Sequence, residues 1–387
     1  MRVPAILSGL VLLSLAAACS AGLAVAPTVA GPAGPAELRV VLVGQALIKQ
    51  DLRPLVPEAV AQAHAYLGDA DVVFTNLEAA VAPAGAQVTP RSESAVHGSV
   101  AVLDCLRDMG FNMLSLANNH AWDLMASGII STREEVARRG FAHAGTGGNA
   151  TEAAVAGYLE TRSGKVALVA MASGARQLTP ETWAGPERPG VNFLEVSPEG
   201  ELNLEQKDRI LAAVSEAARR AAFVVVYQHS HYWGESRGMD GPPGREPRID
   251  RFNTPVWMES WARQLIDAGA NIFVAHGNPA LHGVEIYKNR LILYGLGNYI
   301  FQTKNSLDRY GPLAWYSAVA DSRFEDGRLV ALRFRPLALA MDGEARGAPY
   351  LAQGGEAAAI LGRLAEISRR YGTQLQIDGD TAEVILD

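Results

Sequence analysis

The stretch "LSLANNHAWD", Leu114 to Asp123, joins an apolar run to a tight group of polar side chains. The run "LSLA" is typical of a strand buried on both faces, and Asn118, Asn119 and His120 follow it directly. In open α/β sheets, ligands bind beyond the carboxyl ends of the strands. The stretch therefore predicts an α/β fold with a polar site at the end of this strand.

Outward from this stretch, short apolar runs alternate with amphipathic helical patterns. Such alternation predicts a layered α/β sandwich. A turn at Lys288 and Asn289 is expected to join two paired strands within 283–301. The other expected strands lie at 38–44, from 71 onward, and at 111–120, 166–173, 223–231 and 271–278, and the expected helices at 99–110, 124–140, 205–221 and 257–269.

Length and composition set broad limits on the function. The chain has 387 residues, of which 49% are hydrophobic and 19% charged, which suits one large folded domain with appendages. Its net charge of −7 makes it a poor candidate for non-specific nucleic-acid binding, which depends on neutralising phosphates. We expect no nucleic-acid partner.

The N-terminal residues are typical of an export signal. Arg2 precedes the apolar core "AILSGLVLLSLAAA", which is too short for an ordinary membrane span, and residues 1–18 are therefore predicted to be a signal peptide. Cys19 follows small residues as in a bacterial lipoprotein signal, which predicts a lipid anchor in the membrane, on the periplasmic or outer face. The alternative is a plain cleaved signal. Residues 19–37, rich in Ala, Gly and Pro, are expected to form a flexible tether.

The two cysteines do not suggest a disulfide framework. Once Cys19 is lipidated or removed, Cys105 has no partner within the chain. Its helical surroundings predict a small buried side chain.

Polar side chains follow four of the expected strands. Carboxylate, amide and imidazole groups are ligands that Zn, Mn and Fe accept, and an imidazole beside a metal can also protonate a leaving group. Five of the eight histidines lie in these groups, so a shared divalent-metal site is expected. The groups are Asn76 with Glu78, Asn119 with His120, His229 with His231, and His276 with His282.

Simpler roles remain open for several of these residues. Asn76 and Asn119 could cap the helices that follow them, because Asn is a favoured N-cap residue. His120 could be a structural histidine bonded to Asp123. From their positions on the strand, only one of His229 and His231 is expected to face the site. His282 is more typical of a surface position.

Six segments, in order along the chain, resemble a known family. They are "FTNLEAAV", "LSLANNHAWD", "FAHAGTGGNATEA", "RPGVN", "YQHSHYWGE" and "HGNPALHGVEIYKNRLILYGLGNYIF". Together, over roughly residues 38–340, they resemble the capsule-biosynthesis CapA family, associated with poly-γ-glutamate synthesis and similar to a branch of the calcineurin-like metallophosphoesterases. The resemblance implies the same α/β sandwich, here residues 38–345, with residues 346–387 as a C-terminal α/β extension packed on it.

The resemblance also implies roles for individual residues. Glu78 and Asn119 match metal ligands, and His120 matches the histidine thought to act as the acid beside the metal. His231, or its neighbour His229, matches the next ligand, and His276 the following one. The wider pocket is expected to include Gln45, Asn76, Asn118, Asp123 and His282.

Two departures from the family pattern weaken the expected metal site. Gln45 stands where the first strand usually supplies an Asp, and Pro279 or Ala280 stands where a second late histidine should fall. A neutral amide cannot hold two dications as a carboxylate does, so at most one tightly bound Mn, Zn or Fe ion is expected.

Three functional classes follow from these observations. The chain is expected to be an accessory protein of envelope-polymer synthesis with a partly degenerate metal site, with the polymer or its synthesis and export machinery as its partner. The alternative is an active metal-dependent hydrolase of phosphoester or envelope-polymer bonds. A periplasmic solute-binding protein is a remote third class, because no second lobe is apparent.

Overall fold

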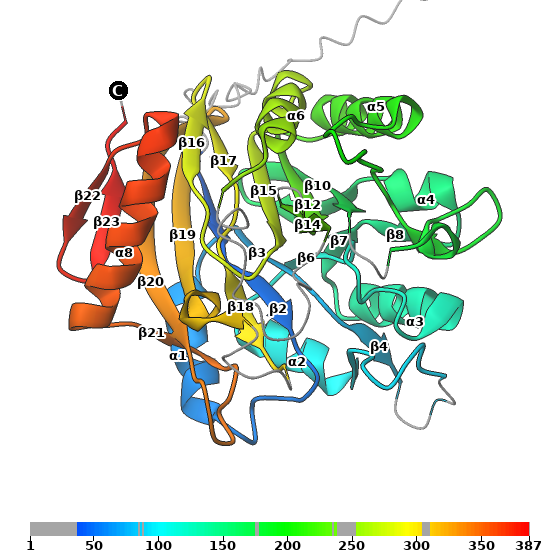
Figure 1. Cartoon of the computed structure of the whole chain (residues 1–387), viewed down its shortest axis with the longest axis horizontal. Helices are drawn as coiled ribbons and strands as arrows, with labels where there is room; N and C mark the ends of the chain where they lie inside the picture. The colour runs from blue at the N-terminus through cyan, green and yellow to red at the C-terminus, as the bar shows by residue number, and fades with distance from the viewer. Residues whose placement is uncertain are drawn as a thin grey trace, which may run out of the picture. The chain divides into compact units, whose positions relative to one another are not determined.

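The computed structural model describes residues 37–83, 86, 89–174, 178–233, 236–237, 253–303 and 310–386 (Figure 1). They belong to one compact unit, residues 35–387. The predicted signal peptide, Cys19 and almost all of the predicted tether lie outside the described residues. Among the described residues, no helix is both long enough and apolar enough to cross a membrane.

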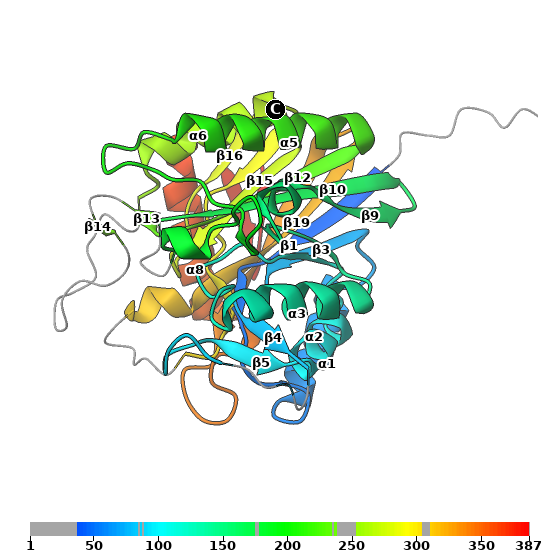
Figure 2. The ribbon, with the colours of Figure 1, turned by 90° about the vertical axis from the view of Figure 1, so that its right-hand side faces the viewer.

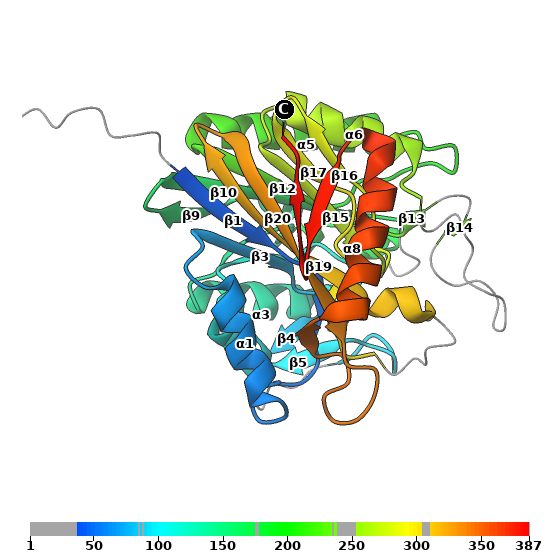
Figure 3. The same ribbon diagram turned by 90° about the vertical axis from the view of Figure 1, so that its left-hand side faces the viewer.

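The first sheet has nine strands and holds both the first and the last strand of the fold (Figure 3). Its first half is parallel, from β1 through β3 and β6, and its second half, beyond β1, is antiparallel. The order is β22 (Leu375–Asp378), β23 (Thr381–Val384), β20 (Arg328–Leu339), β19 (Tyr316–Glu325), β1 (Glu37–Leu42), β3 (Val72–Asn76), β6 (Met113–Ser115) and β7 (Ala142–Ala144), with β21 (Pro349–Leu351) beside β20.

The second sheet has six strands, four of them parallel neighbours. The turn between its last two strands lies at Lys288 and Asn289, whose φ angles of 53° and 58° fit the expected hairpin. The order is β16 (Val284–Tyr287), β17 (Arg290–Leu293), β15 (Ile272–Gly277), β12 (Phe223–Ser230), β10 (Gly164–Ser173) and β9 (Gly157–Thr161).

Helices cover the outer faces of the two sheets, as Figure 2 shows from the side. The layers are held by apolar side chains that alternate along each strand. In β1, Val40 and Leu42 enter the core between the sheets, whereas Val41 enters the core under the helices. The first sheet is covered by α1 (Pro57–Leu67), α2 (Ala101–Asp108) and α3 (Met125–Arg138), and the second by α5 (Leu204–Arg220) and α6 (Val256–Asp267).

This arrangement confirms the predicted layered α/β sandwich. The strands are continuous apolar runs because both of their faces are buried, one against the other sheet and one against helices. Cys105 is fully buried in α2, as expected.

The last part of the chain extends the first sheet. Strands β21 and β23 both pair with β20, and helix α8 (Gly354–Ser368) adds Ile360, Leu361 and Leu364 to the core between the sheets. The shorter elements are β2 (Gln45–Leu47), β18 (Asn298–Phe301), β4 (Ala80–Ala82), β5 (His97–Ser99), α4 (Ala150–Ala154), β8 (Thr146–Gly147), β11 (Gly190–Val191), β13 (Tyr232–Trp233), β14 (Ser236–Arg237) and the 3₁₀ turns η1 (Pro180–Thr182), η3 (Pro312–Trp315) and η4 (Arg369–Tyr371).

Candidate metal centre

The polar side chains meet where parallel strands of the two sheets end. His229 lies in β12 directly opposite His276 of β15, because these two strands are parallel and in register. From the other sheet, the segment after β6 brings Asn119, and the segment after β3 brings Glu78. The β6 strand is shorter than expected and ends at Ser115, so Asn118 to His120 lie in the loop beyond it.

Asn119 lies at the middle of the group. Its Oδ1 atom is 2.7 Å from Nε2 of His229 and 3.3 Å from Nε2 of His231. The two Nε2 atoms are themselves 3.0 Å apart. Three potential ligand atoms therefore point at one another from two different sheets, and all three residues are buried.

Both His229 and His231 face the site, so the expectation that only one of them would do so is wrong. The physical reason is the period of two along a strand. Residues two positions apart project from the same face. His231 directly follows the end of β12 at Ser230, and its backbone N–H donates to the carbonyl of Ser173 in the neighbouring β10.

Glu78 supplies the acidic group. Its Oε1 atom lies 3.9 Å from Nε2 of His229 and 3.9 Å from Nε2 of His120. Its other oxygen, Oε2, is buried and has no hydrogen-bond partner among the described residues. Burial, opposed by the charge of His120, raises the pKa of Glu78 to about 7. A buried carboxylate with an unused oxygen is the kind of group that a cation would satisfy.

His120 lies beside this group and belongs to a separate pair. Its Nδ1 atom is 2.7 Å from Oδ2 of Asp123, which leaves Nε2 directed toward Glu78. Burial acts to lower the pKa of His120, but the hydrogen bond and charge of Asp123, with the charge of Glu78, outweigh it and raise the pKa. The structural and the functional role considered for His120 are thus compatible.

Burial favours the neutral form of His229 and His276. Burial, together with the neighbouring histidines, holds the pKa of His229 well below its usual range. Burial and the charge of the nearby His282 lower the pKa of His276 to about 3. Neutral imidazole is the form that binds metals.

His276 and His282 form the late-strand side of the site. Neither ring nitrogen of His276 has a hydrogen-bond partner among the described residues, and its ring lies 5.5 Å from that of Tyr227. His282 is buried, with 1% of its surface exposed, so the expectation of a surface position is wrong. Its backbone N–H donates to the carbonyl of Gly295, which fixes it against the next turn.

The remaining predicted pocket residues act as supports. Asn118 donates to the carbonyl of Leu77 at 2.7 Å and accepts from the backbone N–H of His120 at 3.0 Å. Asn76 accepts from Asn118 at 3.2 Å. Neither Asn76 nor Asn119 caps a helix, because α2 and α3 begin after other residues and without side-chain caps.

Gln45 binds protein groups at both ends of its amide. Its oxygen accepts from the backbone N–H of Gly277 at 2.9 Å, and its nitrogen donates to Oδ1 of Asn298 at 3.0 Å. Gly277 follows His276, so Gln45 lies on the His276 side of the centre.

Two residues of the site, Asn298 and Tyr227, were not among the predicted site residues. The hydroxyl of Tyr227 is 3.3 Å from Nδ1 of His229. Tyr227 shares a strand face with His229, and that spacing could have identified it.

A single divalent cation fits the donors that meet here. One ligand atom each from Glu78, His229 and His231 can be chosen so that all lie within 4.8 Å of one another. The amide oxygen of Asn119 lies between the two imidazoles and completes a set of oxygen and nitrogen donors suited to Zn, Mn or Fe. The unpartnered Oε2 of Glu78 agrees with this assignment.

The sequence matches a known family over most of its length. Residues 39–303 match the family described as bacterial capsule synthesis protein PGA_cap. The chain belongs to this family. The membership predicted from the six sequence segments is thereby confirmed, and the matched range ends before β19 and β20.

Three known proteins illustrate the range of similarity. The uncharacterized protein y4sH of Sinorhizobium fredii is 29% identical, over 80% of this chain and 84% of that protein. The PGA biosynthesis protein CapA of Bacillus subtilis is also 29% identical, over 54% of this chain and 48% of that protein, so the match spans about half of CapA. A solved structure described as a novel phosphatase from Mycoplasma pneumoniae has a TM-score of 0.47 and 9% identity, over 78% of this chain and 94% of that one.

Proposed function

We propose that this protein takes part in the synthesis of a capsule or poly-γ-glutamate type of envelope polymer, using one divalent metal ion. One observation supports the metal ion. The side chains of Glu78, Asn119, His229 and His231 come together at one buried point. The family, and the name of the relative from Bacillus subtilis as a PGA biosynthesis protein, support this process. The polymer, or the proteins that make and export it, would be the partner.

We expect one tightly held ion rather than two. The family that the sequence resembles usually has an Asp where this chain has Gln45, and the Gln45 amide is bonded to Gly277 and Asn298. Among the described residues, neither ring nitrogen of His276 has a hydrogen-bond partner, and His276 is not part of the ligand group. Glu78 is thus the single carboxylate in the ligand group found among the described residues.

The bound ion would polarise a carbonyl or phosphoryl oxygen of the polymer or its precursor. Side chains of the protein would hold the ligands in position and supply a proton. Asn119, His229 and His231 hold their positions through the contacts between them, and Tyr227 supports His229 from behind. His120, oriented by Asp123, presents Nε2 at the edge of the centre, where it could give a proton to a departing group.

A hydrolase that cleaves phosphoester or polymer bonds is the second candidate. The observation that favours it is the His120–Asp123 pair, because a merely ligand-binding site does not need an oriented acid. An accessory protein would keep the metal ligands without depending on His120.

The test of the metal assignment is titration of the purified protein with Mn or Zn. One tight site is expected in the wild type. Gln45→Asp, alone or with Pro279→His, should raise the number of bound ions. Two tight sites in the wild type, lost in His276→Ala, would show a full binuclear centre and overturn the single-ion assignment. Failure to bind either metal would overturn the metal proposal.

The two candidates are then separated by activity. The purified protein is incubated with a generic phosphoester and with a γ-linked glutamate polymer, with His120→Ala as the matched variant. The accessory role predicts weak or no turnover in both. Hydrolysis that depends on the metal and on His120 would establish the hydrolase instead.

We also propose that the protein is exported and anchored by a lipid on Cys19, on the strength of residues 1–19 alone. Cys19→Ala should release the protein from the membrane fraction or stall its processing. Recovery of the wild-type protein from the cytoplasm with residues 1–18 still attached would contradict export.

A further inference from the structure

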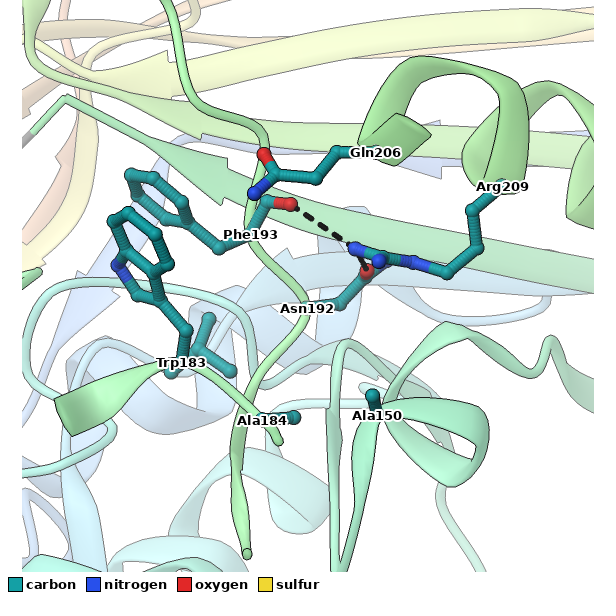
Figure 4. A pocket seen from close by; sticks show the side chains of 8 residues that line it. Ala150, Trp183, Ala184, Asn192, Phe193, Gln206 and Arg209 are labelled. Atoms are coloured by element: carbon teal, nitrogen blue, oxygen red, sulfur yellow. Dashed lines mark hydrogen bonds between the residues drawn. The ribbon is translucent and has the colours of Figure 1, made fainter. Parts of the chain in front are cut away.

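Two of the sequence segments shared with the family do not contribute to the metal centre, and they meet at a second pocket. "TGGNATEA" provides β8 and α4, and "RPGVN" provides β11, which pairs with β8 through Gly190 and Gly147. The pocket is small, with a cavity volume of about 50 Å³, and it lies between these elements and α5. Figure 4 shows Ala150 and Asn192 on its walls, with Gln206 and Arg209 reaching toward it from the helix.

The guanidinium group of Arg209 is incompletely hydrogen-bonded among the residues that the structure describes. Its Nη2 atom makes two long contacts, 3.3 Å to the carbonyl of Phe193 and 3.5 Å to Oδ1 of Asn192. Its Nε atom is buried without a partner among the described residues. Glu205 is close enough for its charge to act on Arg209, yet the two form no ion pair in the described part of the chain. Burial lowers the pKa of Arg209.

A partly buried guanidinium without a carboxylate partner is unusual, because the charge gives up hydration without compensation. The nearby polar groups do not supply that compensation, since Asn192 uses its Nδ2 on the carbonyl of Ala170. Gln206 lies one turn before Arg209 on the same helix face, and its Oε1 accepts from the backbone N–H of Glu195. Its Nε2 has no hydrogen-bond partner among the described residues and could donate to a ligand.

The opposite wall of the pocket is aromatic. The rings of Trp183 and Phe193 stack with centroids 4.2 Å apart and planes 11° from parallel. The indole N–H of Trp183 donates to the carbonyl of Leu178, which fixes the ring in place. The pocket thus pairs fixed donors for an anion with a flat apolar surface for a short aliphatic chain.

The pocket lies close to the metal centre. Phe193 forms a β-bridge with Ala172 of β10, and Ala172 lies opposite His229 of β12. Two strand spacings separate the backbones of Phe193 and His229, which is roughly 10 Å. A polymer bound at both places would have to span this separation.

We propose that this pocket binds a carboxylate on a glutamyl unit of the polymer, with Arg209 and Gln206 as donors and Trp183 against the methylene groups. This inference rests on the proposed function for the identity of the ligand. The carboxylate provides the counter-charge that Arg209 lacks, and a γ-linked glutamate chain carries one free carboxylate and two methylene groups in every residue. A unit held here would place a neighbouring part of the chain at the metal centre.

The test is titration of the full-length protein with a synthetic γ-linked glutamate oligomer, and with the same oligomer after its carboxylates are converted to amides. The wild type should bind the first and not the second. Arg209→Gln should bind the oligomer roughly 10- to 100-fold more weakly, because a charged hydrogen-bonding group is lost. Arg219→Gln is the matched control, since Arg219 is exposed on the same helix and pairs with Glu216.

Further variants keep the test decisive if Arg209→Gln does not fold. Gln206→Ala and Trp183→Leu should each weaken binding, while Arg209→Lys should retain part of it. Equal binding by the wild type and all of these variants, or no binding of the oligomer by a folded wild type, would overturn the proposal.

The metal measurement keeps this outcome separate from the proposed function. Oligomer binding that depends on Arg209 in a protein without metal affinity would support the pocket and contradict the metal proposal. Metal binding without any Arg209-dependent oligomer binding would support the metal and overturn the pocket.

Discussion

Oδ2 of Asp123 lies 2.7 Å from Nδ1 of His120 and also accepts a hydrogen bond from the backbone N–H of Val96 at 2.6 Å. One buried carboxylate oxygen thus ties the imidazole to the segment that precedes β5. The contact leaves only Nε2 of His120 free to face Glu78, which makes His120 a candidate proton donor and separates it from the metal ligands.

The first prediction concerns His120. His120→Ala should leave the number of bound metal ions unchanged, because His120 is not among the residues whose ligand atoms meet. Any hydrolytic rate of the protein should fall by roughly 10²- to 10⁴-fold, the usual contribution of a positioned acid. Metal analysis and a rate measurement on the same sample check both parts. Loss of the metal from this variant would place His120 among the ligands.

The second prediction concerns the ligands themselves. His231→Ala should weaken metal binding by more than the roughly 10- to 100-fold seen when a residue behind a ligand is changed, because one of few donors is removed. Calorimetric titration with Zn or Mn measures the loss. His64→Ala, an exposed histidine on α1, should bind metal as the wild type does. Equal affinity in the two variants would remove His231 from the centre.

The third prediction concerns Gln45 as a structural residue. Gln45→Ala leaves the buried N–H of Gly277 and the buried amide oxygen of Asn298 without their partner. The free energy of unfolding should fall by about 1–3 kcal/mol, the cost of unsatisfied buried polar groups. Urea denaturation measures it. Gln50→Ala, at an exposed position, should change stability by less than about 0.5 kcal/mol.

The fourth prediction concerns pH and stability. Burial acts to raise the pKa of Asp321, but its hydrogen bonds and ion pairs with Arg39 and Arg335 outweigh this and hold it below the usual value. A carboxyl whose pKa is lowered by folding stabilises the protein above its unfolded pKa of about 4, and this contribution is lost as pH falls through the lower, folded-state value.

Asp321→Asn should therefore lower the melting temperature at pH 7, and the difference from the wild type should shrink as the pH falls below about 4. Melting curves of both proteins from pH 7 to pH 3 give the comparison. Asp342→Asn, at an exposed position, is the control. A difference that stays constant over this range would argue against the ion pairs as its source.

The fifth prediction concerns Cys105. Burial raises the pKa of its thiol to about 12, so very little reactive thiolate exists at neutral pH. In a Cys19→Ser background, the folded protein should resist iodoacetamide at pH 8, and the same protein in urea should react fully. Mass spectrometry distinguishes the two. Rapid labelling of the folded protein would mean that α2 opens locally.

The sequence predicts the layers of the fold well because buried parallel strands appear as continuous apolar runs. The 38–44, 166–173 and 223–231 segments all show this pattern, and each forms a strand between two cores. The second sheet's pairing partners were not accessible in this way, since apolar runs do not specify which strand lies beside which. The burial of His282 is not apparent from the sequence because it depends on contact with Gly295, in the segment between β17 and β18.

The site was predicted more completely than the pocket beside it. Strand-end positions make Glu78, Asn119, His229 and His231 candidates, although only one of the two histidines was expected to face the site. Asn298, in contrast, reaches Gln45 across 253 residues of sequence. Arg209 and Trp183 carry no local pattern that separates them from ordinary surface residues. The pocket that they share forms only when the segments at 150, 183–184 and 191–193 pack against α5.

The position of β1 in the middle of the first sheet has a consequence for the order in which the chain can fold. One edge of β1 pairs with β3 and the other with β19, where Glu37 lies opposite Glu325. During synthesis, nearly 300 further residues must be made after β1 before β19 can cover that second edge. A fragment confined to residues 39–303 would keep all the metal ligands yet leave a central strand with an open edge, available to pair with another chain. A cell that handles the unfinished protein would therefore need to shield this edge until β19, which begins at Tyr316, is made.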